Sequence, residues 1–414
     1  MNTADKGSLS RYRWFIVGLL FLATANNYVN RITLSVVIPE VKRDLAIDDI
    51  QYSYVLSVFQ FAYMFGMLAA GKFIDRIGTK LGYLALMTAW SLSATLHAAA
   101  GSAFSLGAWR TILGVSEAGN FPAAVKSVSE WFPIRERAFA TSLFNSGPHV
   151  AMVAGPPLIA FMTLAAGWRT TFLVIGLSGF LLVAAWPFFY REPPENDVSS
   201  REKGTETSNP WTWRKLLGYR DTYGIMLGKF FTDPVWWFYI FWLPNYLNTQ
   251  RGLDIKAIGF AIPLIYLVAI MLGIAGGWLP GFLMRRGWPV SKARKTAMLV
   301  SALCLPVTAL AVVAQQVWLT IALVGLACGA HSGWSNNIFT LVSDRFPSKA
   351  VGSVTGLGGF AGAVGGFLIS TFAVGYIVTY VGYVPIFILM GVLHPLAMLC
   401  VHCFVRGEPV ATER

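Results

Sequence analysis

Long apolar stretches, separated by short polar connections, run along nearly the whole chain. Reading the apolar windows that are bounded by charges, Pro and Gly predicts twelve segments of roughly 20 to 25 residues, long enough for a helix to cross a bilayer. The stretches are continuously apolar and do not alternate with polar residues, which favours helices over a β-barrel. The predicted segments start near Trp14, Tyr52, Leu81, Phe104, Ala138, Trp168, Thr222, Ala257, Lys295, Val317, Gly352 and Gly382.

The composition also indicates lipid as the solvent. Of the 414 residues, 55% are hydrophobic and 13% are charged, and the mean hydropathy is +0.57. Soluble domains carry about 25% charged residues, so the composition argues against a water-soluble protein. The four Cys lie within apolar stretches and predict neither a disulfide framework nor a metal site. We therefore expect an all-α membrane protein.

Basic residues are distributed unevenly between alternate connections. Of the 32 Lys and Arg, 24 fall on the side that holds both termini and five on the other side. By the positive-inside rule, both termini are expected in the cytoplasm. This asymmetry explains the net charge of +12 without a nucleic-acid partner.

A polar stretch divides the predicted helices into two sets of six. Residues 191–220 contain Glu-Pro-Pro-Glu and show no apolar periodicity, which predicts a cytoplasmic linker. It separates an N-terminal half, residues 14–190, from a C-terminal half, residues 221–405, with cytoplasmic tails at residues 1–13 and 406–414. A repeat of the string Ser-Glu-Trp-Phe-Pro at residues 129–133 as Ser-Asp-Arg-Phe-Pro at residues 343–347 supports two related halves. Such halves are typical of alternating-access transporters.

Ionisable side chains within the predicted spans are candidate functional residues, because a charge in lipid is costly unless it is paired or solvated. The first span carries Arg31, with Tyr28 three residues earlier. The fourth span carries Arg110, Glu117 and Asn120 along one helical face. Desolvation and a neighbouring Arg act in opposite directions on a buried carboxyl, so Glu117 is predicted to exchange a proton. A purely structural ion pair with Arg110 is the alternative.

The seventh span presents Lys229 and Asp233 at i, i+4 spacing, followed by the aromatic run at 236–242. We expect Lys229 to reach back towards the cytoplasm and Asp233 to be a candidate for a second proton-coupling site. Trp237 is a candidate for stacking on a sugar ring, although lipid-facing packing explains an aromatic run equally well.

The tenth span is too polar between residues 331 and 337 for a lipid-facing helix. The repeat places His331 opposite Glu117, and two amides, Asn336 and Asn337, follow it. All three are candidates for substrate binding.

The connection at residues 71–80 contains Gly71, Asp75, Arg76 and Gly78 in an order that resembles the G-x-L-x-D-R-x-G-R-K loop of the major facilitator superfamily. The resemblance implies charge contacts that help to hold a cytoplasmic gate. The corresponding connection in the second half departs from the pattern at Gly281, where an Asp is expected.

Further strings resemble the hexuronate transporters of the anion:cation symporter family within that superfamily. The resemblance implies proton-coupled uptake of galacturonate or glucuronate at the bacterial inner membrane. It implies that Arg31 and Arg110 handle the carboxylate, Glu117 the proton, and Tyr28, Tyr63 and polar residues of the tenth span the hydroxyls. The strings lie at 59–63, 119–124, 130–133, 232–239 and 331–344.

The main departure from this family is Asn30, because the family commonly has Asp-Arg where this chain has Asn30-Arg31. An amide cannot carry a coupling proton, so Asn30 is expected among the substrate-binding residues. Glu117 is then the main proton site, and one proton would accompany one monoanion. We expect a monomer whose ligands are a sugar acid anion and protons, with no cofactor and no metal.

Several other functions are alternatives to hexuronate uptake. Uptake of another organic anion, such as galactonate, glucarate or tartrate, would use the same two Arg. A multidrug exporter of lipophilic cations would need an acidic cavity. The chain has no H-E-x-x-H, G-x-S-x-G or G-x-x-x-x-G-K motif, which argues against an enzyme or an ATP-driven pump. The sequence does not exclude a channel or a nutrient sensor.

Overall fold

The structure is a computed structural model that describes residues 3–132, 134–191 and 211–406. Most of the predicted linker, residues 192–210, and residues 407–414 of the predicted C-terminal tail lie outside the described residues. Residues 3–13, predicted as a cytoplasmic tail, form the first turns of a long helix. Within the described residues the chain is helical and has no strand.

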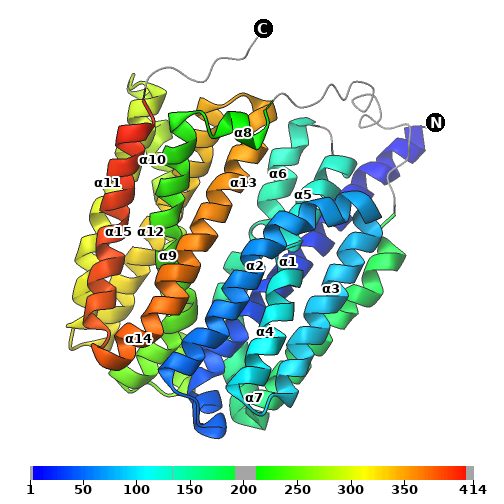
Figure 1. Ribbon diagram of the computed structural model, residues 1–414. Coiled ribbons are helices and arrows are strands. Elements are labelled where there is room, and N and C mark those ends of the chain that lie inside the picture. Colours follow the sequence, from blue (N-terminus) through cyan, green and yellow to red (C-terminus); the bar gives the residue numbers. More distant parts are fainter. Residues whose placement is uncertain (1–2, 133, 192–210, 407–414) are drawn as a thin grey trace. The chain divides into compact units, whose positions relative to one another are not determined.

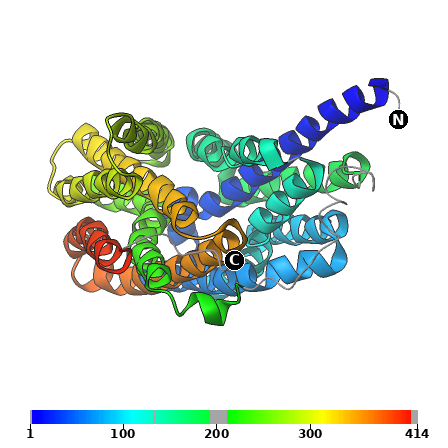
Figure 2. The same ribbon diagram turned by 90° about the horizontal axis from the view of Figure 1, so that it is seen from above.

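The chain divides into two compact units. Unit 1 comprises Met1–Ile47 and Val58–Thr207, and unit 2 comprises Asp48–Ser57 and Ser208–Arg414. Within each unit the helices run side by side (Figure 1), and in the view from above many are seen nearly end-on (Figure 2). The helices that supply unit 1 are α1 (Thr3–Leu45), α2 (Asp49–Ile77), α3 (Thr79–Leu96), α4 (Ala103–Glu117), α5 (Asn120–Trp131), α6 (Ile134–Phe144) and α7 (Gly147–Phe189).

Unit 2 continues the helical pattern and also includes the first turns of α2. Tyr52 of α2 donates a hydrogen bond to the carbonyl oxygen of Phe241 at 2.7 Å, and Asn245 donates one to Asp49 at 2.8 Å. The helices of unit 2 are α8 (Trp213–Leu216), α9 (Arg220–Arg251), α10 (Ile255–Arg285), α11 (Val290–Thr308), α12 (Val317–Arg345), α13 (Ser348–Gly365), the π-helical segment η4 (Gly366–Phe372), α14 (Ala373–Tyr380) and α15 (Val384–Phe404).

Each predicted apolar segment lies on helix, and breaks occur where the sequence supplies Gly. The segments predicted from Ala138 and Trp168 meet within α7, where Gly167 has φ 81° and ψ 165°. A positive φ is easily adopted only by Gly, so the break falls directly before Trp168. The segment predicted from Phe104 is interrupted at Ala118 and Gly119, between α4 and α5.

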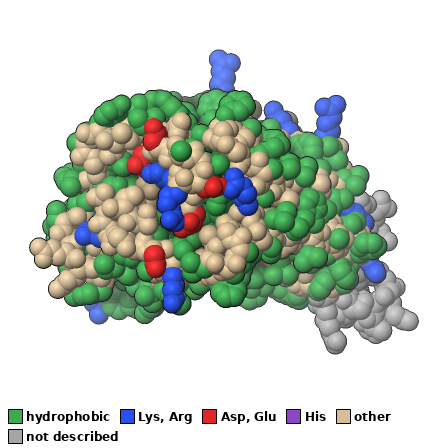
Figure 3. All heavy atoms as spheres, turned by 90° about the horizontal axis from the view of Figure 1, so that it is seen from below, with side chains coloured by type: hydrophobic (Ala, Val, Ile, Leu, Met, Phe, Trp, Pro, Cys, Tyr) green, Lys and Arg blue, Asp and Glu red, His purple; other side chains and the backbone are tan. Residues whose placement is uncertain are grey.

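Burial follows the pattern of a protein in lipid. Large apolar side chains such as Phe104, Leu181 and Met271 are 86%, 73% and 71% exposed, whereas Arg31 and Arg110 are at most 1% exposed. Seven helices in the described residues are long and apolar enough to cross a membrane. Helices α1 and α9, which carry charged side chains, and the 15-residue helix α4 are not among them. Figure 3 views one end of the molecule, where acidic and basic side chains lie among hydrophobic ones.

The contact between α9 and α13 depends on the absence of a side chain at Gly365. A Cβ atom there would overlap the carbonyl oxygen of Phe230, and Pro234 also lies close. Gly356, on the same helix, has open space around it.

We therefore predict that Gly365→Ala lowers the apparent melting temperature of the purified protein, since forced overpacking costs about 1–3 kcal/mol. Gly356→Ala is the matched control and should be neutral or stabilising by about 0.5–1 kcal/mol, because Ala favours helix. Equal melting temperatures for the two variants would contradict the close packing of α9 on α13.

Candidate functional site

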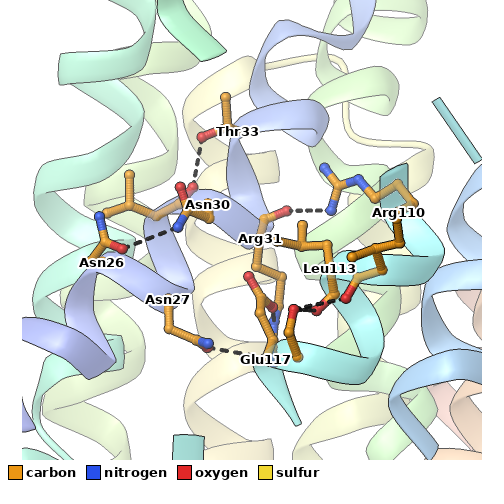
Figure 4. A network of polar contacts seen from close by, with 11 residues as sticks. Asn26, Asn27, Asn30, Arg31, Thr33, Arg110, Leu113 and Glu117 are labelled. Atoms are coloured by element: carbon orange, nitrogen blue, oxygen red, sulfur yellow. Dashed lines mark hydrogen bonds and ion pairs between the residues drawn. The ribbon is translucent and has the colours of Figure 1, made fainter. Parts of the chain in front are cut away.

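A buried ion pair joins α1 to α4 within unit 1. Nε of Arg31 lies 3.0 Å from Oε2 of Glu117, and the two side chains are 1% and 0% exposed. Figure 4 shows both side chains pointing towards each other from their two helices. A buried ion pair is stable only when its remaining polar atoms are well placed, and removing one partner leaves an uncompensated charge. A change of charge on either side chain would therefore have a large effect on the stability of the pair.

Aromatic rings surround the Arg31 guanidinium. Its central carbon lies 4.6 Å from the centre of the Tyr28 ring, 4.7 Å from that of Tyr63 and 5.6 Å from that of Phe59. Asn27 accepts a hydrogen bond from Nη2 at 3.4 Å. Cation–π contacts strengthen when water is excluded, so the rings favour a fixed cation at this position.

Arg110 adds a second buried cation beside the pair. Its Nη1 donates to the backbone carbonyl oxygen of Arg31 at 3.2 Å, and its guanidinium lies 5.6 Å from the Phe59 ring centre. Among the described residues of unit 1, the buried Arg and carboxylate side chains are Arg31, Arg110 and Glu117. Two cations and one carboxylate leave an excess positive charge, which suits an organic anion. The alternative of a structural ion pair between Arg110 and Glu117 differs from the arrangement described, in which Glu117 pairs with Arg31.

Asn30 and Asn120 point to contacts away from the ion pair. Asn30 donates to Asn26 at 3.1 Å, which in turn donates to Ser178 of α7 at 3.3 Å. Figure 4 shows Asn26 and Asn30 on the side of α1 away from Glu117. The Asn120 amide accepts a hydrogen bond from the Tyr83 hydroxyl and donates one to Thr24, and this residue is fully buried.

In unit 2, Lys229 and Asp233 form the i, i+4 ion pair that their spacing predicts. Nζ of Lys229 lies 3.0 Å from Oδ1 of Asp233, with the side chains 7% and 17% exposed. The ammonium group also lies 4.5 Å from the Phe339 ring centre. Lys229, which was expected to reach back towards the cytoplasm, is thus held by Asp233 on the same helix.

His331 is enclosed by other rings. It stacks on Trp236 with 5.5 Å between ring centres, and its Nδ1 lies 3.3 Å from Nε2 of His394. Trp237 stacks on Phe241 and is only 8% exposed. Each of these two candidate substrate-binding residues therefore already stacks one ring face on a protein side chain.

The two amides of α12 bind backbone carbonyls. Asn336 donates to Gly273 at 3.3 Å, and Asn337 donates to Gly276 at 3.0 Å and to Gly333 at 2.8 Å. They therefore join α12 to α10.

The predicted gate residues lie at the turn between α2 and α3. Gly78 separates the end of α2 from the start of α3, and its φ of 89° is a backbone conformation that suits Gly. Asp75 forms an ion pair with Lys126 of α5 at 2.7 Å, while Gly71 and Arg76 lie on the last turns of α2. Among the described residues, no group of three or more metal-binding side chains comes together.

Sequence reasoning did not identify Phe59, Thr24, Tyr83 or His394 as part of these clusters. Phe59 lies in the string at 59–63. Thr24 precedes Arg31 by seven residues, which places Thr24 and Arg31 on the same face of α1. Tyr83 and His394 stand alone in apolar stretches, so only the fold brings them to Asn120 and His331.

Comparison with known proteins adds the family. The model described as Major Facilitator Superfamily matches residues 20–370. The chain belongs to the Major Facilitator Superfamily. This membership confirms the predicted superfamily and agrees with the all-helical structure.

Relatives named as transporters cover between 65% and 96% of this chain. A protein of Bacillus subtilis named as a probable galactarate/D-glucarate transporter is 31% identical over 92% of this chain and 89% of its own length. The hexuronate transporter of Escherichia coli is 28% identical over 96% of this chain and 95% of its own length. The galacturonate transporter of Dickeya chrysanthemi is 30% identical over 65% of this chain and 81% of its own length.

Solved structures show the same fold. A bacterial homologue of the human lysosomal transporter Spinster, in an inward-facing and unoccupied conformation, aligns with a TM-score of 0.79 and 16% identity, covering 96% of this chain and 99% of that one. The family, its transporter relatives and the membrane-length helices confirm the prediction of a multi-pass transporter of the bacterial inner membrane rather than an enzyme.

We predict that Lys229→Met destabilises this Major Facilitator Superfamily protein by about 1–3 kcal/mol, because Asp233 loses its partner in a mostly buried position. Adding Asp233→Asn should restore most of the loss in apparent melting temperature.

Lys126→Met is the control for this experiment. Because its partner Asp75 is 71% exposed, this change should lower the free energy of unfolding by at most about 1 kcal/mol. If the loss of stability in the double variant equalled the sum of the losses in Lys229→Met and Asp233→Asn alone, the coupling of Lys229 to Asp233 would be contradicted.

Proposed function

We propose that this chain is a proton-coupled symporter that imports a sugar acid, with a hexuronate such as galacturonate or glucuronate as the substrate. In this proposal twelve helices span the bacterial inner membrane, both termini lie in the cytoplasm, and the two six-helix halves work by alternating access as a monomer. The single observation that carries it is the buried Arg31–Glu117 ion pair with Arg110 beside it. The names of relatives that transport sugar acids support the substrate class.

The ion pair suggests how a proton and an anion are coupled. Arg31 can pair with the Glu117 carboxylate or with the carboxylate of a substrate. Protonation of Glu117 removes its negative charge, so Arg31 and Arg110 then present an excess positive charge to a sugar acid. By linkage, a bound sugar acid favours the protonated Glu117 to the same extent. Proton and substrate therefore load together, and the loaded protein changes between its outward-open and inward-open states.

Rings and hydroxyl groups complete the proposed binding site. Tyr28 and Tyr63 flank the Arg31 guanidinium and offer hydroxyls to the sugar as well as aromatic faces. Trp237, His331, Asn336 and Asn337 of unit 2 remain candidates for the ring and hydroxyls of the substrate.

A second candidate is another sugar acid anion, either a dicarboxylic one such as galactarate or glucarate or the monocarboxylic galactonate. The relative that is 31% identical is named as a probable galactarate/D-glucarate transporter, and one that is 27% identical is named as a D-galactonate transporter. Counterflow in proteoliposomes preloaded with galacturonate separates these possibilities. Block by glucuronate but not by galactarate, galactonate or neutral galactose is the expected result. Stronger block by galactarate or galactonate would move the substrate to that anion.

Glu117→Gln is predicted to lose accumulation driven by a pH gradient while keeping exchange of one sugar acid for another, because an amide keeps the size of the side chain but cannot exchange a proton. Glu136→Gln, which removes a partly exposed carboxylate paired with Arg13, is the control and should transport normally. Loss of exchange together with accumulation in Glu117→Gln would make the residue structural.

We expect uptake of a monoanion to respond to a pH gradient and to ignore an imposed membrane potential. One proton moving with one monoanion carries no net charge, whereas each net charge would couple at about 2.3 kcal/mol per 100 mV. Potential-driven currents with galacturonate would contradict this stoichiometry and indicate a second proton site, such as Asp233 or His331.

A further inference from the structure

Thr24, Asn120 and Tyr83 form a continuous hydrogen-bond chain through unit 1. The Tyr83 hydroxyl donates to Oδ1 of Asn120 at 2.6 Å, and Nδ2 of Asn120 donates to Oγ1 of Thr24 at 3.2 Å. All three residues are 0% exposed. The chain links α3, α5 and α1 by groups that carry no charge, so a proton or an anion arriving nearby does not change its donors and acceptors.

One end of this chain is fixed by aromatic packing. Tyr83 meets Trp186 edge to face with 4.9 Å between ring centres, and Trp90 edge to face at 5.8 Å. The Trp186 indole donates in turn to the backbone carbonyl oxygen of Lys80 at 3.0 Å. Edge-to-face pairs and a paired indole hold a ring in one orientation, so Tyr83 is a rigid anchor for Asn120.

The other end of the chain joins the same two segments as the ion pair. Asn120 begins α5 three residues after Glu117, the last residue of α4. Thr24 precedes Arg31 by seven residues, almost two turns, on the same face of α1. Because α1 and the α4–α5 segment run in opposite directions, Thr24–Asn120 and Arg31–Glu117 are two neighbouring connections between the same two segments.

Regular helix geometry is interrupted between the two connections. Ala118 and Gly119 separate α4 from α5, and the Gly119 amide donates to Ser116, three residues back, at 3.3 Å. An interruption of this kind lets the two helical pieces change their angle. The angle between α4, which ends at Glu117, and α5, which begins at Asn120, therefore depends on contacts outside these two helices.

We propose that the hydrogen-bond chain of Tyr83, Asn120 and Thr24 positions Glu117 against Arg31 and thereby sets the pH at which the transporter takes up its proton. This inference rests on the proposed role of Glu117 as the proton site. Asn120 is then a positioning residue whose amide is occupied by protein partners, in place of the substrate contact that the sequence predicted.

The other charged and titratable groups around the ion pair do not belong to this hydrogen-bond chain. The charged and titratable residues that surround Glu117 and Arg31 are Tyr28 on α1, Tyr63 on α2 and Arg110 on α4. None of them bonds to Thr24 or to Asn120 in the described residues. A shift in the pH dependence after a change at Thr24 therefore reports the position of Glu117.

The test compares Thr24→Val, which removes the hydroxyl, with Thr24→Ser, which keeps it. Labelled galacturonate uptake into proteoliposomes is measured over a range of external pH. Weaker contact with Arg31 makes the negative carboxylate less favourable, so Thr24→Val should move half-maximal uptake to higher pH by about 0.3–1 unit, a two- to tenfold change in proton affinity. Thr24→Ser should retain the wild-type profile.

Tyr83→Phe is the second variant and should shift the profile in the same direction, since it removes the other hydrogen bond of Asn120. Thr163→Val is the matched control. It removes a buried hydroxyl that lies 3.0 Å from Thr171 within α7, away from the ion pair, and should leave the pH profile unchanged. At acidic pH, where the site is fully protonated, the affinity of Thr24→Val for galacturonate should equal that of the wild type.

The outcomes separate this inference from the function on which it rests. Wild-type uptake that does not depend on pH would reject the proton role of Glu117 itself. With a pH-dependent wild type, an unchanged midpoint in both Thr24→Val and Tyr83→Phe would overturn the positioning role, as would an equal shift in Thr163→Val. A loss of affinity for galacturonate at every pH would assign Thr24 and Asn120 to direct substrate contact instead.

Discussion

Charge inside a lipid-facing helical protein has to be compensated, and this constraint organises unit 1. Arg31 and Glu117 compensate one another at 3.0 Å, while Arg110 bonds to the backbone of Arg31 and leaves the cluster with an excess cation. The cost of an uncompensated buried charge is large, so the cluster favours whichever anion restores the balance. In the proposed function, transport of an acid follows from this electrostatic requirement together with a proton that neutralises Glu117.

Neutral contacts supply the rigidity that a changing ion pair cannot. Aromatic rings of Tyr28, Phe59 and Tyr63 hold the Arg31 guanidinium on its flanks. Hydrogen bonds that involve Asn120 join uncharged groups of Tyr83 and Thr24. Unit 2 has a corresponding division between the Lys229–Asp233 ion pair and the ring stack of Trp236 on His331.

Apolar length predicted the all-helical fold, because a bilayer requires long apolar helices. The break at Gly167 and the i, i+4 pair of Lys229 with Asp233 followed from local geometry. The partner of Glu117 did not, since Arg31 lies on α1 and Arg110 on the same helix as Glu117, and only packing selects Arg31. Contacts such as Tyr83 with Asn120 join residues that are 37 positions apart, and no periodicity reveals them.

The central claim is that a sugar acid and the Glu117 carboxylate compete for Arg31. The most direct measurement follows the pH of a weakly buffered solution of the solubilised protein while galacturonate is added. Above neutral pH the wild type should take up protons as galacturonate binds, approaching one proton for each molecule bound, and Glu117→Gln should bind galacturonate without proton uptake. Binding by the wild type with no proton uptake at any pH would contradict the account.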